Sequence, residues 1–169
     1  MVTIRPERPE DYDAARAVSD AAFGAGSPEG GLVDALRDEG AHVPELCLVA
    51  LDGDDLVGHI VFSRARLASG HEVLALAPMA VVPDRQRAGI GSRLVREATE
   101  RARATGYPLI VVLGHPEYYP RFGFEPAADH RIEAPWEVPP EAWMVLPLPA
   151  YDARARGVVT YAHAFDAVT

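Results

Sequence analysis

One segment decides the fold of this chain, the stretch MAVVPDRQRAGIGS at residues 79–92. It has the pattern of an apolar strand, a polar loop and the first turn of a helix. The N–H groups of a first helical turn and the positive end of the helix dipole favour phosphate, and glycines let it approach closely. No Asp or Glu lies between Gln86 and Arg96, which leaves the helix start free for an external anion. The alternative interpretation is an ordinary tight turn before a helix.

Two well-known phosphate loops do not fit this segment. A P-loop requires Gly-Lys-Ser/Thr, and the chain contains no lysine. A Rossmann fingerprint requires three glycines near the first strand, but here the third glycine position is Leu94 and no acidic ribose ligand follows. Neither of these two phosphate-binding motifs therefore describes the segment.

The apolar pattern on both sides of this segment predicts a mixed α/β protein. Helical periodicity predicts helices at residues 10–23, 32–37 and 89–105, with a Gly/Ser/Pro loop at 24–31. Apolar runs predict an antiparallel meander of strands at residues 46–51, 56–62 and 73–82. A strand at 109–113 follows the third helix closely enough to be a parallel partner, and further strands are expected at 2–5, 142–146 and 158–163.

Length, charge and composition limit the function further. With 169 residues, one domain spanning 1–169 is expected. The net charge of −9 argues against nucleic-acid binding and fits a cationic amine acceptor better. There is no apolar run of about 20 residues and no signal-peptide core at the N-terminus, so we expect a cytoplasmic protein that does not bind membranes. Cys47 is the single cysteine and is expected to be buried.

The segment at residues 79–92 resembles the signature of the GNAT N-acetyltransferase superfamily, Gln/Arg-x-x-Gly-x-Gly/Ala, through Gln86, Gly89 and Gly91. The resemblance extends to the opening Ile4-Arg5-Pro6 and to residues 118–124. Residues 114–119 and 158–165 look most like a group of predicted N-acetyltransferases with poorly defined acceptors. The resemblance implies a single-domain GNAT fold, with a mixed, mostly antiparallel sheet that is splayed between its fourth and fifth strands and flanked by helices. The implied activity is acetyl transfer from acetyl-CoA to a primary amine of an unidentified small molecule or protein.

The resemblance also implies where acetyl-CoA binds. Its pantetheine arm would lie along the fourth strand in the gap before the fifth, bonded to the backbone of Met79, Ala80 and Val81. Its pyrophosphate would meet the loop and the helix start, at Arg87, Ala88, Gly89, Ile90, Gly91 and Ser92. Many family members bond the pantetheine through an asparagine on a late helix, and this chain has no asparagine. Either His115 or a backbone group replaces it, or the contact is missing.

Two proton transfers need side chains. Tyr119 is four residues before Gly123-Phe124, the place of the family's tyrosine near the cofactor sulfur, and is the candidate general acid for the leaving thiolate. The alternative is a packed aromatic residue beside Phe122. The base that removes the amine proton stays open among Glu72, His71, His59 and a water molecule.

Other readings of the chain also stay open. The same fold can serve as a non-catalytic acyl-CoA-binding or regulatory module, and the late strands can pair between chains in a homodimer. A structural zinc site is not expected, because the histidines are not spaced as a ligand set with the lone cysteine. No metal cofactor is implied. Trp136 and Trp143 are expected in the core or in a pocket wall.

Overall fold

The computed structural model describes residues 1–168, which form two compact units. Unit 1 comprises residues 1–63, 77–101 and 162–168, and unit 2 comprises residues 64–76 and 102–161. The chain passes between the units within strands β3 (Asp55–Leu67) and β4 (Glu72–Val81), at the end of helix α3 (Ile90–Ala102), and between Tyr161 and Ala162. Each unit is described separately below.

The described residues form a mixed sheet whose strands follow the order β1-β2-β3-β4-β5-β8-β6, with β9 paired to β3 and β7 paired to β9. The remaining strands are β1 (Val2–Pro6), β2 (Leu48–Asp52), β5 (Leu109–Leu113), β6 (Glu125–Pro126), β7 (Ile132–Glu133), β8 (Trp143–Pro147) and β9 (Gly157–Thr160). The remaining α-helices are α1 (Tyr12–Phe23) and α2 (Pro28–Glu39). Short 3-10 turns, labelled η, join several of these elements.

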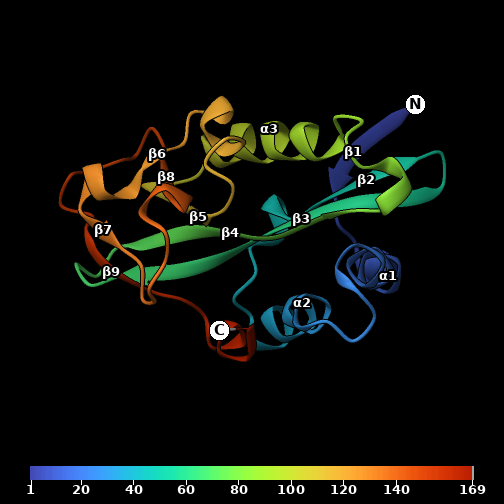
Figure 1. The fold of residues 1–169 in the computed structure, drawn as a ribbon, viewed down its shortest axis with the longest axis horizontal. Coiled ribbons are helices and arrows are strands. Elements are labelled where there is room, and N and C mark those ends of the chain that lie inside the picture. Colours follow the sequence, from blue (N-terminus) through green and yellow to red (C-terminus); the bar gives the residue numbers. More distant parts are fainter. Residues whose placement is uncertain (169) are drawn as a thin grey trace. The chain divides into compact units, whose positions relative to one another are not determined.

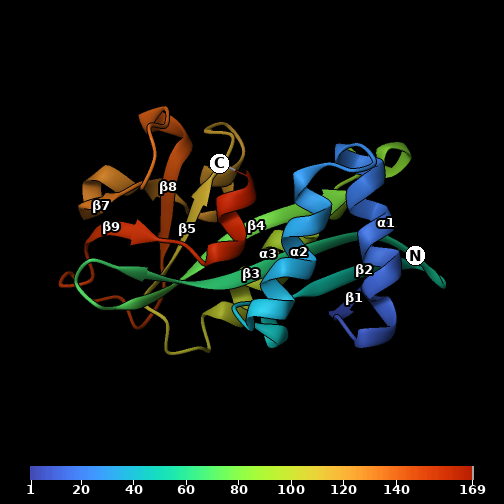
Figure 2. The same cartoon turned by 90° about the horizontal axis from the view of Figure 1, so that it is seen from below.

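In unit 1, helices cover both faces of the sheet. Strands β1, β2 and the first part of β3 pair antiparallel, with Ile4 opposite Ala50 and Leu48 opposite Ile60. Helices α1 and α2 lie on one face of these strands and α3 lies on the other (Figure 1). Seen from below, α1 and α2 run side by side, and the C-terminal 3-10 turn (His163–Val168) lies against α2 (Figure 2).

The alternation of side chains along β3 explains the two layers of helices. A Cβ at Gly58 would lie 3.3 Å from Leu94 and 3.4 Å from Ile90, so α3 packs closely against the strand at this glycine. The next residue, His59, points to the opposite face, where its Nε2 lies 2.8 Å from Ser19 Oγ of α1. Successive residues of a strand face opposite sides, so two neighbours on β3 hold α3 and α1.

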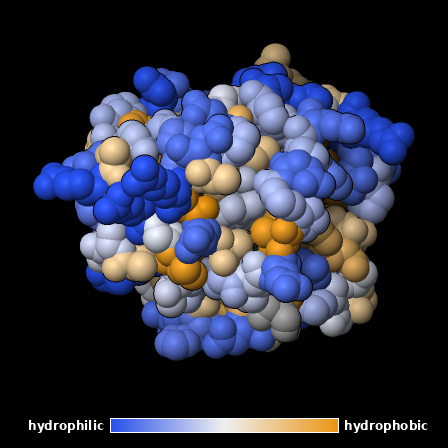
Figure 3. All heavy atoms as spheres, turned by 60° about the vertical axis from the view of Figure 1, so that its left-hand side comes forward, coloured by the Kyte–Doolittle hydropathy of each residue, from blue (hydrophilic) through white to orange (hydrophobic). Residues whose placement is uncertain are grey.

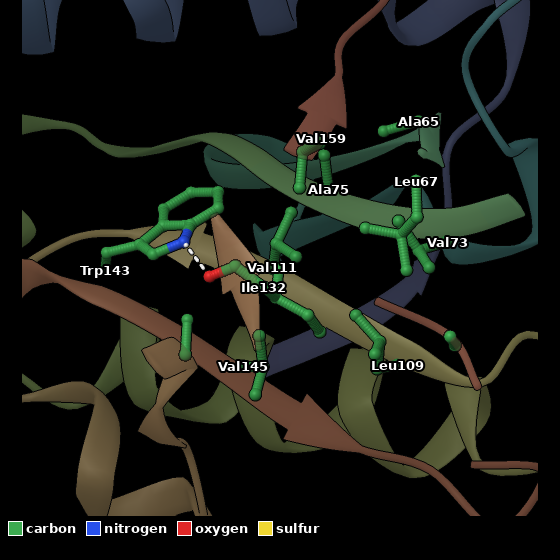
Figure 4. Packing of buried hydrophobic residues seen from close by; sticks show 12 residues of the cluster. Ala65, Leu67, Val73, Ala75, Leu109, Val111, Ile132, Trp143, Val145 and Val159 are labelled. Atoms are coloured by element: carbon green, nitrogen blue, oxygen red, sulfur yellow. Dashed lines mark hydrogen bonds between the residues drawn. The ribbon is translucent and has the colours of Figure 1, made fainter. Parts of the chain in front are cut away.

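In unit 2, β5 pairs parallel with β4 on one side and antiparallel with β8 on the other. The β4–β5 register within the described residues consists of Leu74 opposite Ile110 and Ala75 opposite Val111, whereas β4 continues to Val81. Figure 4 shows the core that these strands enclose, in which Trp143 donates from Nε1 to the Ile132 carbonyl at 3.1 Å. The core residues are Ala65, Leu67, Val73, Ala75, Leu109, Val111, Ala127, Ile132, Trp143, Val145, Ala155 and Val159.

Several predicted boundaries move in the structure. The loop expected at residues 24–31 ends at Ser27, because Pro28 occupies the first turn of α2. Leu46 belongs to a 3-10 turn, so β2 begins at Leu48, and β9 ends at Thr160. Helix α3 ends at Ala102, earlier than the Thr105 expected. Helix α1 buries Ala15 and Val18, and the expected burial of Cys47 is confirmed.

The surface in Figure 3 is mostly hydrophilic, and apolar residues reach it in small separate patches. Among residues 1–168, no helix has the length and apolar character that a membrane crossing requires.

Candidate active site

The segment predicted to bind phosphate forms a sharply turned, exposed loop in unit 1. Its Gln86 side chain donates from Nε2 to the Val81 carbonyl at 2.9 Å, which ties the loop to the end of β4. Two residues adopt positive φ, Arg87 at 64° and Gly89 at 87°. The first helical bond of α3 runs from the Arg93 N–H to the Gly89 carbonyl at 3.0 Å. The loop thus delivers the chain from β4 directly into the N-terminus of α3.

The start of α3 is suited to an anion. No acidic residue lies in its first turn. The N–H groups of Ile90 and Gly91 are in this turn and have no intrahelical acceptor, because no residue of the helix lies four positions before them. The Arg87 side chain is exposed, and no described residue forms an ion pair with it. Its neighbour Arg85, in contrast, lies 2.6 Å from Asp52. The loop and the helix start therefore contribute backbone donors, the positive end of the helix dipole and one uncommitted guanidinium.

The backbone leading to this loop is held in place from the sheet. Ala80 and Val81 are buried, and Met79 is half-buried. A Cβ at Gly58 would lie 3.2 Å from the Ala80 carbonyl oxygen, so β3 approaches β4 closely here. The Val82 N–H donates to the Val57 carbonyl at 2.9 Å. The end of β4 and the start of α3 are thus held against the same strand, which fixes the loop at both ends.

Tyr119 lies in unit 2, in a cluster of aromatic rings. Its ring meets Tyr118, Phe122 and Phe124 edge-on, with centroids 5.1, 6.4 and 5.5 Å away. The other side of the ring faces Gly114, where a Cβ would lie only 2.3 Å from Tyr119 Cε2. Gly114 therefore makes room for the ring, a role that the sequence did not reveal.

The hydroxyl of Tyr119 is protonated at neutral pH. Burial, with a smaller contribution from Tyr118, raises the pKa of this phenol to about 12. No described residue hydrogen-bonds the hydroxyl. A buried phenol without a partner holds its proton and can donate it to a group that develops negative charge.

The element that carries Tyr119 differs from the prediction. The family resemblance of residues 118–124 implies a late helix that carries this tyrosine, but residues Tyr119–Phe122 form a single 3-10 turn. Pro120 lies at its start, and Gly123 ends it in a left-handed conformation with φ of 97°. A proline cannot donate within a helix and a left-handed glycine terminates one, so only one turn can form.

The three candidate bases have different surroundings. His59 is 1% exposed in unit 1, and burial together with the charge of Arg37 lowers its pKa to about 4. A group with so low a pKa is a weak base, and its burial against Ser19 keeps it away from solvent, so the structure disfavours His59 as the base. In unit 2, Glu72 is exposed and lies 3.6 Å from Arg66, while His71 Nδ1 lies 2.9 Å from Ser69 Oγ. His71 and Glu72 line a hollow of about 470 Å³ that solvent reaches.

The residues described by the structure contain no group of three or more His, Cys, Asp or Glu side chains that could hold a metal ion. His130 instead connects Glu125, 2.6 Å from its Nε2, with the Tyr151 hydroxyl, 3.1 Å from its Nδ1.

His115 is exposed, and its carbonyl accepts the N–H of Tyr118 at 3.1 Å. Trp143 is buried and Trp136 half-buried in the wall of a hollow, as predicted.

The chain is similar to known proteins of one family. Residues 13–124 match the family model described as the acetyltransferase (GNAT) family. The chain belongs to the GNAT acetyltransferase family. It is 40% identical over 147 residues to the uncharacterized N-acetyltransferase YjhQ of Escherichia coli K12, covering 83% of this chain and 81% of that protein.

Two solved GNAT structures are similar to the chain over nearly its whole length. The E. coli GNAT protein YhbS, solved with CoA, has a TM-score of 0.88 at 31% identity, covering 98% of this chain and 92% of that one. A GNAT acetyltransferase from Brucella melitensis, solved with acetyl-CoA, has a TM-score of 0.81 at 34% identity, covering 98% and 99%. The predicted mixed α/β GNAT fold is thereby confirmed, and the chain is an acetyltransferase of this family.

Proposed function

We propose that the chain transfers an acetyl group from acetyl-CoA to a primary amine, with residues 1–169 acting as one catalytic domain. The observation that carries this proposal is the acid-free N-terminus of α3, which follows an exposed loop with the uncommitted Arg87. These groups match a pyrophosphate in charge and in hydrogen-bonding type. Two similar GNAT structures were solved with CoA or acetyl-CoA, which supports the same ligand here.

We assign the cofactor contacts within unit 1 to two groups of residues. The backbone of Met79, Ala80 and Val81 would bond the pantetheine arm, although the Val81 carbonyl already accepts one bond from Gln86. A carbonyl oxygen has two lone pairs, so this bond leaves room for another. The pyrophosphate would lie against residues Arg87, Ala88, Gly89, Ile90, Gly91 and Ser92.

Acetyl-CoA supplies an activated acyl group and a thiolate leaving group. The thiolate needs a proton or a close donor as it leaves, and Tyr119 is the proposed general acid because the family resemblance places its phenol, which is protonated at neutral pH, near the cofactor sulfur. A base must accept the proton of the attacking amine. His71, Glu72 and a water molecule remain the proposals for this role, since His59 is buried and packed.

Acetyl-CoA binding is tested by thermal melting of protein shown to carry no CoA from expression. At a hundredfold excess over its dissociation constant, the ligand should add about 2.7 kcal/mol, which raises the midpoint by several degrees. No shift with either CoA or acetyl-CoA would contradict the proposal. A panel of amines, including polyamines, amino acids, aminoglycosides and peptides, is then screened for thiol release.

The same assay separates catalysis from a non-catalytic acyl-CoA-binding module. A module would melt at a higher temperature with acetyl-CoA, yet it would release no thiol with any amine. The cytoplasmic location and the homodimer that the sequence suggested stay predictions, which cell fractionation and the mass in solution would test.

A further inference from the structure

Unit 2 contains a second feature that the proposed function does not use, a hollow of about 1050 Å³ lined by residues between 128 and 143. Its walls come from the turn after β6, from β7 and from the start of β8. Among its lining residues are Trp136, Trp143, Val138, Glu133, Glu137 and Arg131. Its volume is that of a small-molecule site.

The aromatic wall of the hollow is fixed in position. Trp143 is buried and donates from its indole to the Ile132 carbonyl at 3.1 Å, as Figure 4 shows. Trp136 packs against Tyr161, with ring centroids 4.9 Å apart and planes inclined by 38°. Both indoles are therefore held from behind by other residues of unit 2, which makes a preformed wall rather than a mobile one.

The charged groups of the hollow are not paired with one another. Glu133 and Glu137 are exposed, and neither forms an ion pair with any residue in the described part of the chain. Arg131, which adopts a φ of 57°, is also exposed and without an ion pair among those residues. Two carboxylates against one guanidinium leave the lining with one net negative charge.

We propose that this hollow binds an organic cation, an alkylammonium or alkylguanidinium group. An indole face attracts such a cation through its quadrupole, and an unpaired carboxylate attracts it through its charge. The apolar stem of the ligand would lie against Val138 and the indoles. The inference goes beyond the proposed transferase activity, since it concerns residues of unit 2 alone and requires no bound acetyl-CoA.

The two tryptophans of the chain both line the hollow, so all tryptophan emission of the full-length protein reports on it. Three probes of similar size are titrated, namely N-butylguanidinium, neutral N-butylurea and anionic butyrate. We expect N-butylguanidinium to change the emission saturably and to bind at least several-fold more tightly than the other two. Equal binding of the urea, tighter binding of butyrate, or no saturable change would overturn the proposal.

Charge variants test the same inference with opposite expected signs. Glu133→Gln and Glu137→Gln should each weaken cation binding by about two- to fivefold, the range for exposed charge pairs. Arg131→Gln should strengthen it, because this variant removes a repelling charge. All three side chains are exposed, so the melting midpoint should stay within about a degree or two. Unchanged affinity in all three variants, measured by calorimetry, would also overturn the proposal.

Discussion

The ring of Tyr119 occupies the space that a side chain at residue 114 would need. With a Cβ at Gly114 only 2.3 Å from Cε2, the ring must move before any larger residue can fit. Gly114 directly follows β5, whose end at Leu113 is opposite Trp143 of β8. The sheet therefore fixes Gly114, and Gly114 in turn fixes the side of the tyrosine ring that lies against it.

Gly114→Ala is expected to displace Tyr119 and to destabilise unit 2 by about 1 to 3 kcal/mol, the usual cost of overpacking. Thermal melting measures the stability and thiol release measures the rate, which should fall together. The matched control is Gly106→Ala, where the added Cβ meets nothing within 4 Å. If both alanine variants behave alike, the contact with Tyr119 is not what requires glycine at residue 114.

Tyr119→Phe keeps the aromatic ring and removes the hydroxyl. If the phenol protonates the leaving sulfur, the chemical step should slow by roughly a hundredfold, while acetyl-CoA affinity changes little. The raised pKa of about 12 also predicts that Tyr119 causes no loss of rate by deprotonation below about pH 10. Single-turnover kinetics with an active amine separate chemistry from binding. An unchanged chemical step would remove Tyr119 from the mechanism.

His59 gives a prediction for stability against pH. Its pKa is about 4 in the folded protein and about 6.5 when unfolded. Because folding lowers this pKa, neutral His59 contributes fully to the free energy of unfolding above pH 6.5. The contribution is lost as the pH falls towards 4 and the imidazole becomes protonated. The full loss is about 3 kcal/mol, at 1.36 kcal/mol per pH unit. Urea unfolding between pH 7 and 4.5 measures how the free energy of unfolding depends on pH. In His59→Gln this free energy should fall less steeply as the pH is lowered. An equal pH dependence of the free energy of unfolding in both proteins would show that folding does not lower the pKa of His59.

At the scale of elements, the junction of β4 and α3 was predictable because its signals are local. An apolar run, a polar loop with Gly89, and an acid-free helix start determine each part without reference to the rest of the chain. The turn at Tyr119 was less predictable. The sequence placed the tyrosine by family resemblance, but Pro120 and Gly123 reduce the expected helix to one 3-10 turn.

The packing partners of these elements could not be predicted from local pattern. Gly114 and Tyr119 are five residues apart, and the sequence gives no sign that one ring fills the place of the other side chain. The contact of Ser19 with His59 joins residues 40 positions apart. Before the fold was known, His59 was a candidate base. Long-range contacts decide such roles, and periodicity alone does not contain them.

Gly91→Val tests the start of α3 as an element. A valine here adds bulk beside the N–H groups that should meet the pyrophosphate, whereas Ile90, Leu94 and Ala98 still anchor the helix through their buried side chains. We expect acetyl-CoA binding to be lost, while the far-UV circular dichroism stays that of the parent protein. Normal binding by calorimetry would place the pyrophosphate elsewhere. Gly31→Val in α2, where a Cβ meets nothing within 4 Å, is the control for adding valine to a helix.

At the scale of the whole molecule, the question is whether the two units fold as one. The proposed cofactor contacts lie in unit 1, and Tyr119 and both tryptophans lie in unit 2. Strands β3 and β4 are continuous through both units, so unfolding one unit would leave part of each strand without its neighbours. This continuity favours the single cooperative domain expected for residues 1–169.

Leu36→Ala tests that cooperativity from unit 1. Leu36 is fully buried in α2, and its truncation should cost about 2 to 5 kcal/mol. Tryptophan emission reports only on unit 2, whereas far-UV circular dichroism reports on both units. If the chain is one cooperative domain, Leu36→Ala should lower the midpoints of both signals equally, and Val145→Ala in the core of unit 2 should do the same. A lowered circular dichroism midpoint with an unmoved tryptophan midpoint would show that the units unfold independently, because a destabilised unit 1 would then melt while unit 2 kept its own stability.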